Sequence, residues 1–282
     1  FIMSGILYVV GTPIGNLGDM SPRAVETLEN VDFIAAEDTR VTLKLLNHFG
    51  IKKPMVSYFE HNKHQRGEII CRRILSGENC AIVTDAGMPC ISDPGELLVT
   101  QCEEYGIEVK AVPGPSAVIS ALAISGLPTG RFTFEGFLSV NKKSRMEHLE
   151  SVKNETRTMI FYEAHKLNAT LRDMLGAFGN RSIAIVRELT KIHEEVIRTT
   201  LEQAVEHYSE APLKGEIVLV IDGAKPVDNN KVYTEEEAAD LAIALAAEED
   251  ISLSEASKKA AKETGIKKGI IYKLATERDE VK

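Results

Sequence analysis

The chain has 282 residues, of which 44% are hydrophobic and 27% are charged, and its formal net charge is −9. This length allows two domains with separate cores, and the negative charge argues against a nucleic-acid-binding surface that covers the whole molecule. The four cysteines lack the spacing of a zinc site or a disulfide framework, and the apolar runs are too short to cross a membrane. We therefore expect a cytoplasmic protein without a metal.

The first 126 residues alternate short apolar runs with amphipathic stretches, which predicts a mostly parallel sheet covered by helices. The expected strands are Ile6–Val10, Phe33–Ala36, Met55–Tyr58, Ala81–Thr84 and Val109–Val112. The expected helices are Pro22–Leu28, Thr42–His48, Gln65–Leu75, Gly95–Tyr105 and Ser116–Ile124. Gly126-Leu127-Pro128 ends the last helix and indicates a domain boundary.

Residues 127–224 show a different pattern of apolar runs and amphipathic stretches, which predicts a second α/β domain. Its expected strands are Phe132–Phe137, Met159–Tyr162, Ser182–Val186, Glu195–Arg198 and Glu216–Ile221, and its helices are Lys143–Val152, Lys166–Phe178 and Leu201–Tyr208. The gap between the third and fourth of these strands is too short for a crossover helix. An antiparallel pair is therefore expected there, within a mixed sheet.

Residues 225–282 predict a linker and a small helical module. Lys225–Lys231 is polar, and Tyr233–Asp250 is acidic and rich in alanine, as expected of a solvent-facing helix. In Ser252–Lys282, small and apolar residues and a glycine fall at helix-turn-helix spacing, with a local excess of positive charge. An ordinary helical hairpin is the alternative, because Gly269 weakens the second helix.

Three loops rich in glycine and proline follow strands of the first segment. They are Gly11–Asp19, Thr84–Gly95 and Val112–Ala117. Ligands of open α/β sheets bind at the carboxyl edge of the strands, so these loops predict a pocket. The first loop matches neither the GxGxxG pattern nor the P-loop, and Pro13 removes an N–H that could hold an anion. We therefore do not expect this loop to enclose a pyrophosphate.

The amino-acid sequences of these loops resemble those of the tetrapyrrole-methylase-like, S-adenosylmethionine-dependent transferases. They are most similar to those of the branch that methylates cytidine 2′-hydroxyls of bacterial 16S ribosomal RNA. The motifs that carry the resemblance are GTPIGNLGDMSPRA at Gly11–Ala24, AAEDTR at Ala35–Arg40, DAGMPCISDPG at Asp85–Gly95, VPGPSA at Val112–Ala117, GLPTGRFTFEGFL at Gly126–Leu138, FYEAHKL at Phe161–Leu167 and RELTKIHEE at Arg187–Glu195. The resemblance extends from Ile6 to about Gly223, and it departs from the usual pattern at Met88 and Ser139-Val140.

The resemblance implies S-adenosylmethionine as the cofactor, held largely by backbone groups between two α/β domains, and a homodimer. The residues that it assigns to the cofactor site are Ile14, Gly15, Asp85, Ala86, Gly87, Met88, Cys90, Ile91, Ser116 and Ala117. Because this cofactor has no phosphate, the resemblance also accounts for Pro13.

Transfer of a methyl group to a ribose hydroxyl requires help with the proton. A proton acceptor, or a cation that lowers the pKa of the hydroxyl, is expected among Asp38, Arg40, Glu188 and Lys191. Each of these could instead belong to a structural ion pair. Other residues that could contribute are Glu60, His61, Tyr162 and Glu163.

The substrate implied by the resemblance is 16S ribosomal RNA, free or within the 30S subunit, and RNA offers phosphates to basic clusters. The candidate RNA contacts are Lys142, Lys143, Arg145, Lys258, Lys259, Lys267 and Lys268. Two other functions stay open at this point. The chain could methylate a tetrapyrrole precursor or a protein side chain, or it could be a non-catalytic regulator that binds nucleic acid.

Overall fold

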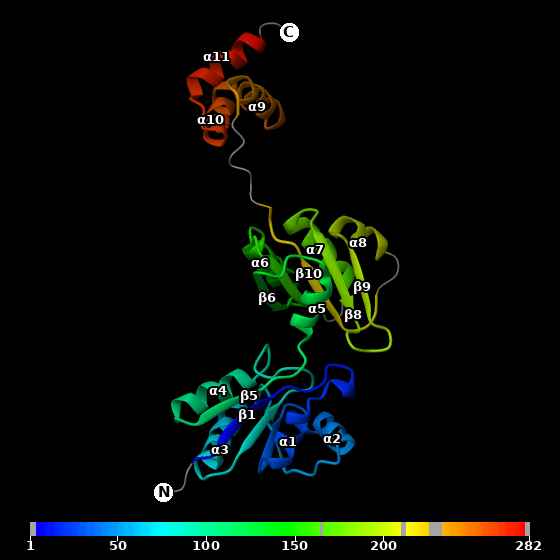
Figure 1. Ribbon diagram of the computed structural model, residues 1–282. Coiled ribbons are helices and arrows are strands. Elements are labelled where there is room, and N and C mark those ends of the chain that lie inside the picture. The colour runs from blue at the N-terminus through cyan, green and yellow to red at the C-terminus, as the bar shows by residue number, and fades with distance from the viewer. Residues whose placement is uncertain (1–3, 164–165, 210–212, 226–232, 280–282) are drawn as a thin grey trace. The chain divides into compact units, whose positions relative to one another are not determined.

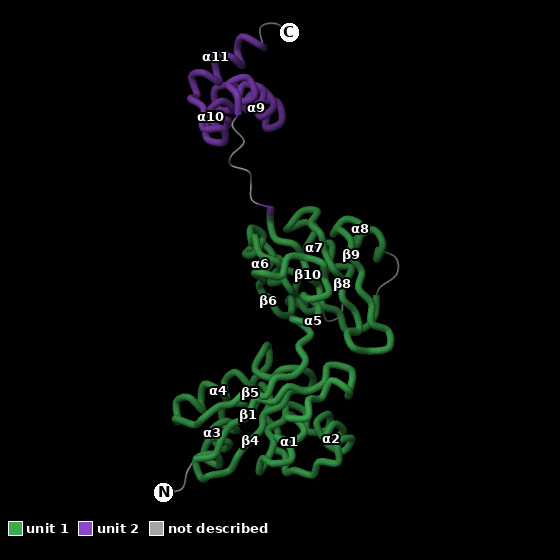
Figure 2. The backbone as a smooth tube through the Cα atoms, viewed as in Figure 1, with its two compact units in different colours: residues 1–224 green, residues 225–282 purple. Residues whose placement is uncertain are grey.

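The computed structural model describes residues 4–163, 166–209, 213–225 and 233–279 (Figure 1). The chain divides into two compact units, residues 1–224 and 225–282 (Figure 2). The described part of the first unit forms two five-stranded sheets with their helices, and that of the second unit is helical. The predicted fold class of two α/β segments followed by a small helical module is therefore confirmed. Residues 226–231 of the predicted linker lie outside the described residues.

The first sheet is parallel throughout, with the strand order β3-β2-β4-β1-β5. Its strands are β1 (Ile6–Val10), β2 (Phe33–Ala36), β3 (Met55–Ser57), β4 (Cys80–Val83) and β5 (Glu108–Val112). The helices of this segment are α1 (Pro22–Asn30), α2 (Thr39–His48), α3 (Lys63–Leu75), α4 (Gly95–Glu104) and α5 (Ala117–Ser125), with a short 3₁₀ turn at η1 (Leu17–Asp19).

The central strands β2 and β4 are buried on both faces, as parallel strands usually are, whereas the edge strands β3 and β5 are partly exposed. Leu7 and Val9 of β1 pack in a cluster with Ile70 of α3, whereas Val10 faces a second cluster that includes Leu28 of α1. This alternation follows from the two-residue repeat of a strand. The two layers of helices therefore fix the sheet and leave its carboxyl edge for the loops.

The second sheet is mixed, with the strand order β6-β7-β10-β8-β9, and among the pairings of its described strands only that of β6 with β7 is parallel. Its strands are β6 (Phe132–Phe137), β7 (Thr158–Glu163), β8 (Ser182–Arg187), β9 (Glu195–Thr200) and β10 (Ile217–Ile221). Its helices are α6 (Lys142–Val152), α7 (Leu167–Phe178) and α8 (Leu201–His207). The antiparallel pair expected from the short gap is β8 with β9.

Helix α5 connects the two sheets of the first unit. Val118 and Leu122 of α5 pack with Ile160 and Val220 of the second sheet. The opposite face of that sheet carries its own cluster, centred on Phe161 and the helices α6 and α7. The helix that ends the first 126 residues therefore covers a face of the second sheet.

The second unit packs α9 (Glu235–Glu248), α10 (Leu253–Thr264) and α11 (Lys268–Asp279) around one small core. Ala238 and Ala242 of α9 are fully buried against Ala260 and Ile271. The expectation of a solvent-facing helix at 233–250 is therefore only half right, because the alanines form a packed face while the acids stay exposed. Gly265 has φ of 73° and ends α10.

No helix in the described ranges is long and apolar enough to cross a membrane.

Candidate functional site

The three predicted loops follow β4, β1 and β5, which are neighbours in the first sheet. The loop after β1 is bonded to the loop after β4, because Thr12 N donates to Gly87 O at 3.0 Å and Gly87 N donates to Thr12 O at 3.1 Å. It also lies against the loop after β5, where a Cβ added to Gly11 would meet Gly114 Cα at 2.6 Å. Glycine is needed at this approach because no side chain fits between the two backbones.

A pocket of about 530 Å³ lies between these loops and the second sheet of the same unit. This is a usual size for a small-molecule site. The lining residues come from both halves of the unit: Ile14, Glu37, Thr84, Asp85, Ala86, Gly87, Met88, Ile91, Ser92, Asp93, Ser116, Ala117, Phe137, Tyr162, Glu163, Val186, Leu189, Gly215, Glu216, Ile217 and Val218. The pocket is therefore complete only when both sheets contribute to it.

Eight of the ten residues predicted to hold the cofactor line this pocket. They are Ile14, Asp85, Ala86, Gly87, Met88, Ile91, Ser116 and Ala117. Gly15 does not line the pocket and instead lies against Lys191, whose Cγ would be 2.8 Å from a Cβ added to Gly15. Cys90 packs near Gly95, and burial raises the pKa of its thiol to about 12. These two residues support the wall without lining the pocket.

The lining is acidic. It contains five carboxylates, and none of its described residues is lysine, arginine or histidine; the five are Glu37, Asp85, Asp93, Glu163 and Glu216. Partial desolvation and the nearby charge of Glu37 raise the pKa of Asp85, and burial raises the pKa of Asp93. A pocket with this charge attracts a cation and repels a phosphate.

The first predicted catalytic pair, Asp38 and Arg40, lies outside the lining at the start of α2. Asp38 Oδ1 accepts a hydrogen bond from Arg40 N at 2.8 Å and therefore begins the helix at Thr39, three residues before the predicted start. The Arg40 side chain binds the same carboxylate at 3.0 and 2.6 Å, and these bonds lower the pKa of Asp38 from 3.8 to about 2. Asp38 N donates to Asp85 Oδ1 at 3.2 Å, so the pair is one hydrogen bond from the pocket.

The second predicted pair, Glu188 and Lys191, lies outside the lining and forms a network with Glu216, which lines the pocket. Glu188 Oε1 accepts from Glu216 N at 2.8 Å and from Lys191 Nζ at 3.1 Å. The Lys191 Nζ also lies 3.0 Å from Glu216 Oε2. The backbone N–H of Glu216 and the Lys191 ammonium lower the pKa of Glu188. The network holds Leu189 and Glu216, which do line the pocket.

Lowered pKa values make Asp38 and Glu188 weak bases at neutral pH. The geometry therefore favours a role in which Asp38 and Glu188 orient Arg40 and Lys191. It does not favour a role as proton acceptors. Of the other residues considered from sequence, Tyr162 and Glu163 line the pocket, whereas Glu60 and His61 do not.

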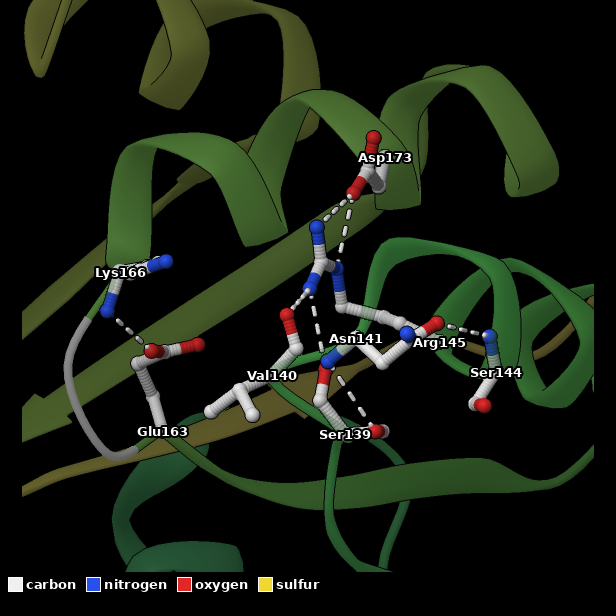
Figure 3. Close-up of polar contacts among 8 residues, drawn as sticks. All are labelled: Ser139, Val140, Asn141, Ser144, Arg145, Glu163, Lys166 and Asp173. Carbon is white, nitrogen blue, oxygen red and sulfur yellow. Dashed lines mark hydrogen bonds and ion pairs between the residues drawn. The ribbon is translucent and has the colours of Figure 1, made fainter.

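The sequence predicts that Arg145 contacts RNA, but its side chain forms hydrogen bonds and a salt bridge within the protein (Figure 3). Its side chain is 7% exposed and forms a salt bridge with Asp173 at 2.7 Å. Its Nη1 also donates to the backbone oxygen of Ser139 at 2.9 Å. These bonds leave the guanidinium engaged within the protein, so the geometry favours a structural role for Arg145 over the predicted contact with RNA.

The predicted lysines, in contrast, are exposed. Lys142 and Lys143 lie on the first turn of α6, Lys258 and Lys259 on α10, and Lys267 and Lys268 at the start of α11. Lys259 pairs with Glu249, and Lys268 Nζ donates to Ser254 Oγ at 2.9 Å. The exposed cluster in the second unit therefore keeps most of its charge available to solvent.

Several lining residues are not among those predicted from the sequence. These residues are Glu37, Ser92, Asp93, Phe137, Val186, Leu189 and the run 215–218. Glu37 could have been found, because it follows β2 directly within the quoted motif AAEDTR. Residues 215–218 enter through the antiparallel pairing of β10, which a local pattern does not reveal.

A parallel sheet whose loops close an acidic pocket against a mixed sheet forms a two-segment α/β fold with a site that suits a cationic small molecule. The family described as Tetrapyrrole (Corrin/Porphyrin) Methylases matches residues 6–205, and the chain belongs to this family. It is therefore an S-adenosylmethionine-dependent methyltransferase, as the sequence predicted.

Named relatives and a solved structure add detail. The chain is 50% identical to "Ribosomal RNA small subunit methyltransferase I" of Synechocystis sp., over 97% of this chain and 98% of the relative. It is 49% identical to the protein of that name from Thermotoga maritima, over 78% of this chain and 99% of the relative. A uroporphyrin-III C-methyltransferase from Thermus thermophilus, solved with S-adenyl homocysteine, is 15% identical with a TM-score of 0.55, over 77% of this chain and 97% of that chain, and shows the shared fold.

The residues of the pocket fit S-adenosylmethionine. This cofactor carries a positive sulfonium and a positive ammonium, and the lining offers carboxylates such as Asp85 and Asp93. Its apolar portions would meet Ile14, Leu189 and Val218, which are at most 9% exposed. A site for a nucleotide phosphate would need cations or an open helix N-terminus, and Ser116 already caps α5 with its own hydroxyl.

Proposed function

We propose that this chain transfers the methyl group of S-adenosylmethionine to the ribose 2′-hydroxyl of a cytidine in the decoding region of 16S ribosomal RNA. The acidic pocket between the two sheets carries the proposal, because it suits a cationic methyl donor. The names of the relatives that match nearly the whole chain support RNA as the substrate. The resemblance described for the sequence motifs supports the 2′-hydroxyl as the acceptor.

The chemistry divides between the cofactor and the protein. When bound, S-adenosylmethionine supplies an activated methyl carbon. The protein must hold the acceptor oxygen within about 3–3.5 Å of that carbon. The loops that contain Thr12, Gly87 and Gly114 are bonded or packed together, so they can orient the donor with little reorganisation.

The two cations near the pocket are proposed to assist loss of the hydroxyl proton, which passes to solvent water as the methyl group moves from the sulfonium to the oxygen. Arg40 and Lys191 are each connected to a lining carboxylate, Arg40 through Asp38 to Asp85 and Lys191 directly to Glu216. Positive charge near the acceptor oxygen lowers the pKa of the hydroxyl and stabilises negative charge that develops on it. In this proposal Asp38 and Glu188 keep the two cations in place.

RNA binding is proposed to involve the exposed lysines at 142, 143, 258, 259, 267 and 268. The Thermotoga relative is shorter than this chain by about the length of residues 225–282. A protein with the same name can thus lack a segment of that size. The second unit is therefore proposed to add affinity for RNA and not to build the methyl-transfer site.

The deciding experiment uses labelled S-adenosylmethionine. The protein is incubated with 30S subunits or free 16S ribosomal RNA from a strain that lacks the modification, and the labelled nucleotide is mapped. Label on the 2′-oxygen of one cytidine is the expected result, and Asp85→Asn should bind the cofactor more weakly. Label on a tetrapyrrole or a protein side chain would replace the proposal with another activity of this family. Cofactor binding without transfer to RNA would indicate a regulator.

We also propose that the chain forms a homodimer, as the resemblance implies, and that it is located in the cytoplasm. Light scattering on the purified protein measures the subunit number directly.

A further inference from the structure

Strand β6 contains a bulge next to the pocket. Its register with β7 pairs Phe134 with Ile160 but Gly136 with Phe161, so Glu135 is an extra residue on β6. Gly136 has φ of 70°, which glycine adopts without strain. Bulges often lie beside functional sites and change the direction of a side chain.

The bulge decides which way Phe137 faces. In a regular strand, Phe134 and Phe137 would point to opposite faces, because they are an odd number of residues apart. Here both rings contact Tyr162, with centroid distances of 5.0 Å for Phe134 and 4.9 Å for Phe137. Glu135 reaches the other side, where its Oε2 lies 3.1 Å from His148 Nε2 of α6. The extra residue therefore turns Phe137 to the pocket face of the sheet.

Phe137 lies at the rim of the pocket. Its side chain is 57% exposed although it lines the pocket, and Ile91 on the facing loop is 56% exposed. The deeper lining is closed, with Ile14 at 9% and Leu189 at 8% exposure. An exposed aromatic ring, supported from beneath by a second ring, has no evident role in packing and is available to a ligand that enters from solvent.

We propose that Phe137 is a substrate-binding residue that stacks on the base of the nucleotide to be methylated. The proposal rests on the function proposed above, and it names the part of the substrate that this side chain contacts. An acceptor nucleotide within RNA can reach the pocket only when it is displaced from its neighbours, and displaced bases stack on aromatic side chains. Tyr162 holds the Phe137 ring at the rim, so little side-chain freedom is lost when a base stacks on it.

The rim location distinguishes the base from the cofactor as the partner of Phe137. The buried apolar residues that fit the cofactor, such as Ile14 and Leu189, form the deeper lining. The acceptor must approach from the open side to reach the methyl carbon, and this path passes Phe137 and Ile91. A stacked base also holds the attached ribose near the pocket, which is the positioning that the transfer needs.

The test compares Phe137→Leu with Phe137→Tyr and Phe137→Trp in the full-length protein. Leucine keeps an apolar side chain but has no ring, whereas tyrosine and tryptophan keep the ring. We expect Phe137→Leu to raise the KM for 16S ribosomal RNA about tenfold or more. The dissociation constant for S-adenosylmethionine, measured by calorimetry, should stay within about twofold of wild type. The two aromatic variants should restore the KM.

Tyr105→Ala is the matched control. Tyr105 is a 45% exposed aromatic residue at the end of α4, which precedes β5 and lies at the sheet edge opposite to the pocket. This variant should leave both constants unchanged. A direct titration of RNA binding accompanies the kinetics, with a single-stranded decoding-region oligonucleotide that carries a fluorescent cytosine analogue at the target position. Wild type should change its fluorescence on binding, and Phe137→Leu should lose this change.

Three results would overturn the proposal. Phe137→Leu could weaken cofactor binding as much as it raises the KM, which would place the ring against the cofactor. It could leave the KM and the fluorescence titration unchanged, or the aromatic variants could fail to restore the KM. Absence of methyl transfer to RNA by the wild-type protein would instead contradict the proposed function, and the fluorescence titration would still decide whether Phe137 contacts a base.

Discussion

Thr12 and Gly87 are joined by a reciprocal pair of backbone hydrogen bonds of 3.0 and 3.1 Å, which forms an isolated bridge between two loops. Gly11, the neighbour of Thr12, lies against Gly114 of the third loop. The first wall of the pocket is therefore a unit of connected backbone. Its shape depends on the main chain, and this explains why its loops are rich in glycine and proline.

Gly11→Ala tests this wall. The added Cβ would lie 2.6 Å from both Cα and N of Gly114, so the loops would have to separate. We expect the free energy of unfolding to fall by about 1–3 kcal/mol, and the affinity for S-adenosylmethionine to fall with it. Urea unfolding and calorimetry measure the two effects. Gly130→Ala is the control, because nothing lies within 4 Å of its added Cβ; equal behaviour of the two variants would contradict the close approach.

Lys191→Ala tests the proposed role of the cation near Glu216. Loss of the ammonium leaves Glu188 and Glu216 without their shared partner and removes positive charge from the pocket edge. We expect kcat for RNA methylation to fall about 100-fold, with a smaller change in cofactor affinity. Lys110→Ala, which removes an exposed lysine 3.1 Å from Glu108, should leave kcat unchanged. A loss explained wholly by weaker cofactor binding would make Lys191 a purely structural residue.

Arg145→Ala tests whether the Arg145 guanidinium stabilises the fold or contacts RNA. Its partner Asp173 is 14% exposed, so removal of the guanidinium leaves a nearly buried carboxylate unpaired. We expect the free energy of unfolding to fall by about 3 kcal/mol, measured by urea unfolding, while the folded protein keeps its RNA affinity. Arg72→Ala removes an exposed pair with a 3.9 Å separation and should cost about 0–1 kcal/mol. Weaker RNA binding by folded Arg145→Ala would restore the prediction made from sequence.

Glu155 gives a pH-dependent contribution to stability. Hydrogen bonds from the Arg157 side chain and backbone lower the pKa of Glu155 from 4.5 to about 2. Because the folded-state pKa is the lower one, the stabilisation is present above pH 4.5 and is lost as pH falls toward 2. Glu155→Gln should therefore lower the free energy of unfolding at pH 6 by about 0.5–1 kcal/mol and change it little at about pH 2. Urea unfolding at the two pH values checks the sign, and an equal effect at both would contradict it.

The lysines of the second unit are predicted to bind RNA phosphates. Replacement of Lys258, Lys259, Lys267 and Lys268 by glutamine should weaken RNA binding and flatten its dependence on salt. The logarithmic slope should change by about 0.7 for each phosphate that the variant no longer neutralises. Cofactor affinity should not change. A salt titration that matches wild type would exclude these lysines from the interface.

Deletion of Ser252–Lys282 is predicted to have the same effect as the lysine replacements, but it exposes the alanine face of α9. Ala238 and Ala242 would lose Ala260 and Ile271, against which they pack. Removal of residues 225–282 is the better controlled truncation, because it ends the chain at the boundary of the first unit. Both truncated proteins should bind S-adenosylmethionine, and RNA affinity equal to that of the full chain would contradict the prediction.

Local patterns predicted most of the elements because each depends on neighbours in the sequence. Apolar runs such as Ile6–Val10 form strands of the first sheet, and the short gap before Glu195 specified an antiparallel pair. Helix α2 begins at Thr39, three residues before the start that the sequence predicts, because the Asp38 side chain caps it. A capping role and a catalytic role use the same residue types, so the sequence does not separate them.

The sequence by itself determined the fold class and the three loops, because strand patterning and turn chemistry are local properties. It also determined the family, through motifs that lie in those loops. Only the tertiary structure showed that Arg145 is paired with Asp173, that Lys191 joins Glu188 to Glu216, and that a bulge turns Phe137 to the pocket. These features depend on strand register and on packing between residues far apart in the chain, and a shift of one residue in register would reverse the face that each strand residue presents.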